Sequence, residues 1–290
     1  MPTNTGLLTR RQMLSRTAAA AGWLGLASPF APLFAGEGSR RFKIGACEWS
    51  LRKGDPIIFD LAKQIGLDGV QVDLGSVDNN MQLRRPEVQQ TYLAAAKKAG
   101  VAISSLAIAE MNKVPLKSDP QAAQWLADAI AVMKALNVKI VLIAAFSKGE
   151  LKGDQAGIDH TVEVLKQLAP KAEQAGVIFG LENYLSAEEN LDILKRVGSP
   201  AVQVYYDVGN STDKGYDIYR EIRMLKGKIC EFHAKDAKSR LGQGRIDFRK
   251  VRAVMDEINY SGWIQIEAPA PRGAVVDYRE DHAYLREVFS

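Results

Sequence analysis

The chain has 290 residues, 47% of them hydrophobic and 25% charged, with a formal net charge of +4. Apolar and charged residues are spread evenly beyond the N-terminal segment, which favours one large domain over two. The two cysteines, Cys47 and Cys230, fall in predicted strands that are not neighbours in the fold inferred below. A disulfide framework is therefore not expected, and both are predicted to be buried thiols.

The first thirty-five residues differ in composition from the rest. The pair Arg10-Arg11 precedes an Ala/Gly/Leu-rich run over residues 17–35, and the whole segment lacks acidic residues. This pattern resembles a twin-arginine export signal cleaved near Ala35. Pro29 and Pro32 interrupt the run, which is shorter than the roughly 20 apolar residues of a spanning helix, so no stable membrane anchor is expected. We predict a signal peptide over residues 1–35, a mature domain over residues 36–290, and a periplasmic or secreted protein.

Cleavage changes the charge of the protein. Arg10, Arg11 and Arg16 precede the predicted cleavage site, which leaves a net charge of +1 on the mature chain. A basic footprint for nucleic acid is absent from the sequence, and no nucleic-acid partner is expected.

From Phe42 onward, short β-rich apolar runs alternate with longer segments of helical periodicity, as in parallel βα units. The predicted strands are Lys43–Cys47, Gly69–Val72, Ala102–Ala107, Lys139–Ala144, Val177–Leu181, Val202–Tyr206, Ile229–Phe232 and Ile264–Ile266. The predicted helices are Ile57–Ile65, Pro86–Ala99, Pro120–Leu136, Gly157–Ala175, Ala187–Arg196, Ile218–Leu225, Phe248–Ile258 and Tyr278–Val288. Eight such units in about 250 residues predict an α/β fold, a (β/α)8 TIM barrel. No Gly-rich phosphate turn follows the first strand, which argues against a doubly wound nucleotide-binding sheet.

Four consecutive predicted strands end on residues that bind metals. They are Glu182, Asp207, His233 and Glu267, after the fifth, sixth, seventh and eighth strands. In barrel enzymes the C-terminal strand ends converge on one mouth, so these side chains are expected to meet. Singly, each carboxylate could be a surface residue or a helix cap. Three carboxylates and an imidazole at one mouth call for a cation to offset their charge.

The donor set indicates which cation is expected. Three carboxylate oxygens, one imidazole nitrogen and no thiolate favour Mn²⁺, with Mg²⁺, Co²⁺ or Zn²⁺ as alternatives and Ca²⁺ disfavoured. One divalent metal ion is therefore predicted, with open positions for the oxygens of a sugar-like substrate.

The segments around these ligands resemble a known family. Residues 180–183, 206–210, 232–236 with 241–244, and 266–269 are similar to the sugar phosphate isomerase/epimerase group of xylose isomerase-like TIM barrels, which includes ketose 3-epimerases. The resemblance covers the chain from about Phe42 to its C-terminus. It implies that Glu182 and Glu267 bind metal and also act as the catalytic pair, one removing a proton and the other returning it. Asp207 and His233 would then be structural ligands, and homo-oligomers, common in the family, are an open possibility.

Six further residues near the strand ends are candidate substrate contacts. Ketose epimerases usually carry a histidine three residues after the metal-binding aspartate, where this chain has Asn210, and an arginine soon after the metal histidine, where Arg240 lies at a similar offset. The other candidates are Glu48, Trp49, Lys235 and Asp236. The alternatives are packing for Trp49, a loop charge for Arg240, and mutual pairing in the loop for Lys235 and Asp236.

Three functions follow as hypotheses. The leading one is a metal-dependent sugar isomerase or epimerase that acts outside the cytoplasm by deprotonation and reprotonation beside a carbonyl. The second is a metal-dependent lyase or hydrolase that cleaves 3-keto glycosides after the same first proton abstraction. The third is a non-catalytic sugar-binding protein, because a fold alone does not establish activity.

Overall fold

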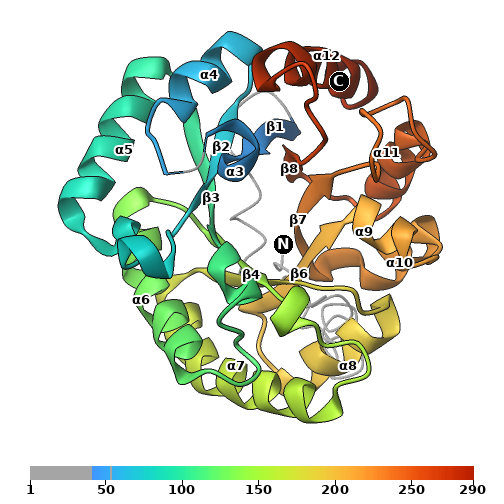
Figure 1. The fold of residues 1–290 in the computed structure, drawn as a ribbon. Helices are drawn as coiled ribbons and strands as arrows, with labels where there is room; N and C mark the ends of the chain where they lie inside the picture. Colours follow the sequence, from blue (N-terminus) through green and yellow to red (C-terminus); the bar gives the residue numbers. More distant parts are fainter. Residues whose placement is uncertain (1–40, 53) are drawn as a thin grey trace, which may run out of the picture.

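The structure, a computed structural model, describes residues 41–52 and 54–290. In this part of the chain, parallel strands close into a barrel in the order β1 to β8 (Figure 1), as predicted. The strands are β1 Phe42–Cys47, β2 Gly69–Asp73, β3 Ala102–Ile108, β4 Ile140–Ala144, β5 Ile178–Glu182, β6 Val202–Asp207, β7 Ile229–Ala234 and β8 Gly262–Ile266. Pairing of β8 with β1 completes the barrel.

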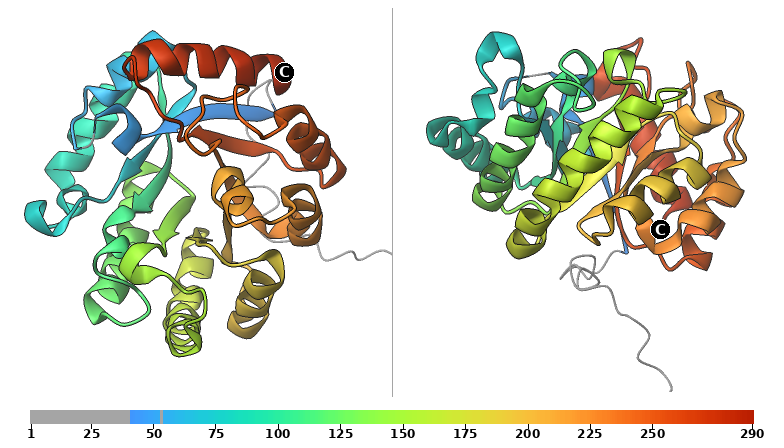
Figure 2. Two further views of the ribbon diagram at one scale, coloured as in Figure 1. Left: turned by 45° about the vertical axis from the view of Figure 1, so that its right-hand side comes forward. Right: turned by 90° about the horizontal axis from the view of Figure 1, so that it is seen from below.

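Helices surround the strands on the outside of the barrel, which the rotated views of Figure 2 also show. The main helices are α4 Ile58–Ile65, α5 Pro86–Ala99, α6 Pro120–Leu136, α7 Gln155–Ala175, α8 Ala187–Val197, α10 Ile218–Leu225, α11 Phe248–Glu257 and α12 Ala274–Val288. Each corresponds to a predicted helix. The largest difference is at α12, which begins four residues before the predicted Tyr278.

Local sequence signals explain where several helices begin and end. The Asp119 side chain caps α6 by accepting from the backbone N–H of Gln121, and Ser186 forms a capping box with Glu189 at α8. Gly100, just past the end of α5, has a φ of 72°. This left-handed conformation costs glycine little, which accounts for the sharp stop.

The apolar core lies between the barrel and the helix ring. Side chains from five helices are buried there, with relative exposures of 0%: Phe59, Leu126, Leu165, Ile222 and Leu285. Burying one such side chain contributes about 1.5–3 kcal/mol. Because helices cover the outside of the parallel strands, the strand residues are buried on both faces, so the polar residues that line the barrel interior must find partners there.

Two short helices were not predicted from the sequence. They are α3 Glu48–Leu51, directly after β1, and α9 Val208–Asp213, directly after β6. Both begin at the barrel mouth. None of the helices in the described part of the chain is long and apolar enough to cross a membrane. The predicted signal peptide lies outside the described residues.

Candidate functional site

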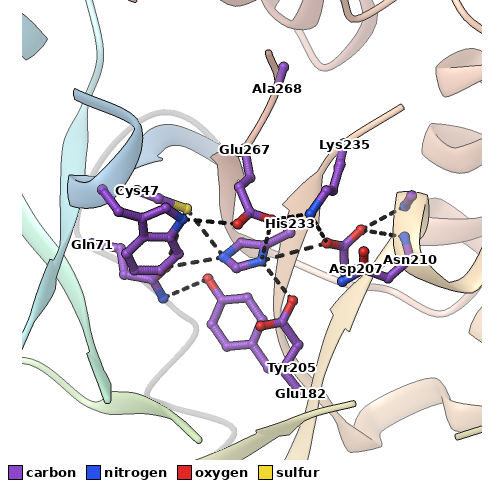
Figure 3. A network of polar contacts seen from close by, with 12 residues as sticks. Cys47, Gln71, Glu182, Tyr205, Asp207, Asn210, His233, Lys235, Glu267 and Ala268 are labelled. Atoms are coloured by element: carbon purple, nitrogen blue, oxygen red, sulfur yellow. Dashed lines mark hydrogen bonds and ion pairs between the residues drawn. The ribbon is translucent and has the colours of Figure 1, made fainter. Parts of the chain in front are cut away.

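The four predicted ligands meet at the C-terminal mouth of the barrel. Glu182 ends β5, Asp207 ends β6, His233 lies one residue before the end of β7, and Glu267 follows β8. Each offers a ligand atom, and these four atoms all lie within 4.8 Å of one another. Figure 3 shows the carboxylates gathered around the imidazole, with Glu267 and Glu182 on opposite sides of it.

Strand alternation and register bring the side chains together. Asp207 on β6 is paired with His233 on β7, which is paired with Gln265 on β8, two residues before Glu267. Residues two apart on a strand face the same way, so Gln265 and Glu267 share the inward face. Asp207 and His233 therefore lie at one level of the barrel, and Glu267 lies two residues further towards the mouth, on the same inward face.

The imidazole of His233 is central to the cluster and fully buried. Its Nδ1 lies 2.9 Å from Oε1 of Glu182, 3.6 Å from Oε2 of Glu267 and 3.9 Å from Oδ2 of Asp207. All three carboxylates thus approach the same ring nitrogen. The opposite ring nitrogen, Nε2, points away from them into the barrel interior, 3.1 Å from Oε1 of Gln71.

Asp207 divides its two oxygens between different tasks. Oδ1 accepts hydrogen bonds from the backbone N–H groups of Gly209 and Asn210 and so caps α9. Oδ2 is buried in the cluster without a hydrogen-bond partner. Asp207 therefore does cap a helix, which was the alternative considered for each carboxylate. Only Oδ1 serves as the cap, so Oδ2 remains available to bind a cation.

The electrostatics of the cluster indicate a missing positive charge. Burial, with the nearby carboxylates of Glu267 and Glu182, raises the pKa of Asp207 to about 7. For His233, burial acts against the charged form, but the Cys47 sulfur and the Glu182 carboxylate outweigh it and raise its pKa well above the usual range. Without a metal ion, protons bound to Asp207 and His233 would offset part of the negative charge of the cluster.

Glu267 is held by two donors besides the imidazole. The indole N–H of Trp49 donates to its Oε1 at 2.9 Å, and the ammonium of Lys235 donates to its Oε2 at 3.0 Å. Burial opposes ionisation, yet His233, Lys235 and Trp49 together hold the pKa of Glu267 below its usual range. This side chain is fixed as an oriented carboxylate.

A cavity of about 320 Å³ opens beside the cluster. Its lining includes five of the predicted residues, namely Glu182, Glu267, Trp49, Asn210 and Lys235. A small polar substrate in this cavity would contact the carboxylates of both Glu182 and Glu267. A second cavity of about 380 Å³ lies at the opposite end of the barrel, among residues that begin strands, such as Ala102 and Gly262, and the described residues that line it form no such cluster.

Three other predicted substrate contacts lie outside the lining of this cavity and have partners of their own. Glu48 is buried and accepts from the backbone N–H groups of Asp73 and Gly54. Asp236 accepts from the backbone N–H groups of Arg245 and Ile246 and so shapes its loop. Arg240 pairs with three acidic residues of α12: Asp277, Glu280 and Asp281. Lys235 pairs with Glu267, not with Asp236.

The sequence analysis missed several residues near the site. Phe146 and Tyr184, which follow β4 and β5, line the cavity with their ring centroids 4.6 Å apart. The sequence could have indicated both as candidates, because each lies two residues beyond the end of its strand, at the barrel mouth. Cys47 was predicted as a buried thiol, which the structure confirms, and its Sγ lies 3.4 Å from Nε2 of His233.

The donor set suits a divalent metal ion. Two buried carboxylates, one half-buried carboxylate and an imidazole nitrogen form a compact group of hard and borderline ligands, which includes an aspartate oxygen without a hydrogen-bond partner. Burial raises the pKa of Cys47 to about 12, so its thiol stays protonated and is a poor ligand. Glu182, Asp207, His233 and Glu267 could therefore hold the ion, with the cavity giving access to it.

Fold and site together define a (β/α)8 barrel with a carboxylate and histidine cluster at its C-terminal mouth. The chain belongs to the family of xylose isomerase-like TIM barrels, which it matches over residues 59–288. It is 26% identical to a 2-epi-5-epi-valiolone 7-phosphate 2-epimerase from Actinoplanes sp., over 83% of this chain and 89% of the relative. It is 24% identical to an L-ribulose-5-phosphate 3-epimerase from Shigella boydii, over 83% of this chain and 94% of the relative.

Solved structures give the same fold. A D-psicose 3-epimerase from Clostridium cellulolyticum, in complex with D-tagatose, superimposes with a TM-score of 0.74 at 17% identity, covering 86% of this chain and 99% of that one. The homologues are thus sugar epimerases, which supports a sugar isomerase or epimerase and confirms the family expected from the sequence.

Proposed function

We propose that this protein is a metal-dependent sugar epimerase or isomerase that moves a proton at the carbon beside a carbonyl group. The observation that carries the proposal is the placement of Glu182 and Glu267 on opposite sides of the cluster, both lining one cavity. A sugar between them would offer one face of its carbon to each carboxylate. One carboxylate removes the proton, and the other returns a proton to the opposite face, which inverts the stereocentre.

The neighbouring side chains prepare this pair for its task. Trp49 and Lys235 fix both oxygens of Glu267, so this carboxylate meets the substrate in one orientation. Glu182 contacts His233, whose Nδ1 lies 2.9 Å from its Oε1. Lys235, whose pKa the carboxylates of Glu267 and Asp207 raise against the effect of burial, stays charged and can stabilise negative charge that develops on the substrate.

Glu182, Asp207, His233 and Glu267 would hold the metal ion, with Mn²⁺ as our first choice because of the oxygen-rich donor set. Such an ion supplies Lewis acidity that polarises the sugar carbonyl and fixes its position. The carboxylates that serve as ligands then also stand beside the reacting carbon.

We infer that the substrate is an unphosphorylated sugar or sugar derivative. Among the described residues that line the cavity, Lys235 is the only cation, and its ammonium is engaged by Glu267. Phe146, Tyr184 and Trp49 offer aromatic surface that suits the apolar face of a sugar ring. Export by the twin-arginine route, proposed from the sequence, would place the protein outside the cytoplasm, where phosphorylated sugars are scarce.

The test combines metal analysis with proton exchange. The mature protein should contain one metal ion per chain and exchange solvent deuterium into a keto sugar from a panel of free sugars, sugar phosphates and 3-keto glucosides. The last class is included because a 3-keto-D-glucoside 4-epimerase from E. coli shares the fold, with a TM-score of 0.71. A Glu182→Gln/Glu267→Gln double variant should lose both metal and exchange.

Glu110→Gln is a matched control, because Glu110 is a buried carboxylate in the 3₁₀ turn that follows β3, paired with Lys113 outside the cluster. The Glu110→Gln variant should keep both the bound metal and the deuterium exchange. Absence of metal from the wild type, or exchange that survives in the double variant, would refute the proposal.

A further inference from the structure

Directly beneath the cluster, the barrel interior is filled by polar side chains that the proposed chemistry does not use. They are Gln71 on β2, Ser105 on β3, Tyr205 on β6, Glu231 on β7 and Gln265 on β8, all at most 1% exposed. A buried polar group destabilises the fold unless it is hydrogen-bonded. Five such side chains in one layer are therefore expected to form a connected network, in which each group has a defined role as hydrogen-bond donor or acceptor.

Gln71 joins this network to the cluster. Its Oε1 lies 3.1 Å from Nε2 of His233, and its Nε2 donates to the hydroxyl of Tyr205 at 2.9 Å and to Oγ of Ser105 at 3.2 Å. Figure 3 shows Gln71 on the side of the imidazole away from Asp207. The imidazole is thus held between carboxylates at Nδ1 and an amide at Nε2.

The orientation of the Gln71 amide is fixed from below. Ser105 donates its single hydroxyl proton to Oε1 of Glu231 at 3.0 Å. The same carboxylate oxygen accepts from Nε2 of Gln265 at 2.6 Å. Since the hydroxyl proton of Ser105 is used, its oxygen must accept, and the group that donates to it is the NH₂ of Gln71. The carbonyl oxygen of Gln71 therefore faces the imidazole.

This chain of donors determines the tautomer of the histidine. A carbonyl oxygen can only accept, so Nε2 of His233 must carry a proton. When a metal ion displaces the proton on Nδ1, the lone pair of Nδ1 is then the one that faces the carboxylates. The nearby thiol of Cys47, 3.4 Å from Nε2, is a weak partner and does not replace the amide.

We propose that Gln71 is a positioning residue that holds His233 with its proton on Nε2, so that Nδ1 is presented to the metal ion. Ser105 and Glu231 set the direction of the Gln71 amide. The inference rests on the proposed function, because it assigns Nδ1 as a metal ligand. Loss of an outer partner of a ligating histidine typically weakens metal binding about 10- to 100-fold.

The first experiment measures Mn²⁺ affinity by titration calorimetry for the wild type, Gln71→Met and Gln203→Met. Gln203 is a matched control, a buried glutamine on β6 whose amide donates to the backbone of Pro200, away from the site. We expect Gln71→Met to bind Mn²⁺ at least 10-fold more weakly than the wild type, and Gln203→Met to match the wild type in affinity.

Equal Mn²⁺ affinities for all three proteins would overturn this inference and leave the proposed function intact. Failure of the wild type itself to bind Mn²⁺ would overturn both. The two results are distinguishable because the measurement does not depend on turnover.

The second measurement does not depend on whether Gln71→Met folds. The wild type, labelled with ¹⁵N-histidine and loaded with diamagnetic Zn²⁺, is observed by NMR. The chain has three histidines, so His160 and His282 can be assigned by substitution. We expect the remaining signal to show a proton on Nε2 of His233, protected from exchange with solvent. A proton on Nδ1, or none on Nε2, would overturn the inference.

Discussion

Replacing Arg240 with methionine tests whether this residue serves the substrate or the fold. Its guanidinium, 12% exposed, lies 3.1 Å from Oδ1 of Asp281, which is fully buried. Asp277 is also fully buried, but Arg272 contacts it at 2.6 Å, so this carboxylate stays compensated in the variant. Among the described residues, Arg240 is the one cation paired with Asp281, so the variant leaves an uncompensated buried charge.

The expected loss of stability is about 3 kcal/mol, the lower end of the range for breaking a buried ion pair, because water and the partly exposed Glu280 moderate the effect. For a domain of this size, this corresponds to a melting temperature lower by about 6–12 °C. Differential scanning calorimetry measures it. Arg249→Met is the control, since the pair of Arg249 with Glu287 of the same α12 is exposed and worth at most about 1 kcal/mol.

The pH dependence gives a further check on the same variant. Burial, outweighing Arg240, raises the pKa of Asp281 to about 6, above the value of about 3.9 expected in the unfolded chain. The native state therefore takes up a proton on acidification, and removal of Arg240 should strengthen this tendency. The stability difference between wild type and variant should therefore shrink as the pH falls towards about 6 and be largely lost below it, where Asp281 is protonated in both native states.

A substrate role for Arg240 predicts the opposite result. Below the melting range, the structural role leaves KM and kcat of Arg240→Met close to those of the wild type. A melting temperature equal to that of Arg249→Met, together with a KM raised tenfold or more, would refute the reasoning.

Three other expectations concern the cluster itself. Asp207, whose pKa is about 7 without metal, and His233, whose pKa is raised well above its usual range, must both lose a proton to bind metal, so Mn²⁺ affinity should rise with pH through 7, with proton release visible as buffer-dependent binding heats at pH 6; a flat profile would contradict this. Trp49→Phe keeps the ring but removes the hydrogen bond to Glu267, so kcat should fall about 10- to 100-fold with metal content unchanged, as steady-state kinetics would measure. Gly209→Ala would place a Cβ 2.8 Å from the backbone oxygen of Lys235, so its thermal melting point should drop, and unchanged melting would show that the loop yields.

The sequence alone was sufficient for the fold and for the four cluster residues. Periodicity separates helices from strands, and parallel strands place their C-terminal ends at one mouth whatever their side chains. Glu182, Asp207, His233 and Glu267 could be recognised because each follows an apolar run directly, and strand alternation turns such residues inward.

Tertiary structure alone decided the partners of these side chains. Gln71 meets His233 across 162 residues, Trp49 meets Glu267 across 218, and Arg240 meets α12 instead of the cavity. Such pairs depend on how the barrel closes, on the register between strands and on rotamers. Barrel closure, register and rotamers leave no periodic signal in the sequence. The inward direction of a strand residue does, because side chains along a strand alternate with a period of two residues.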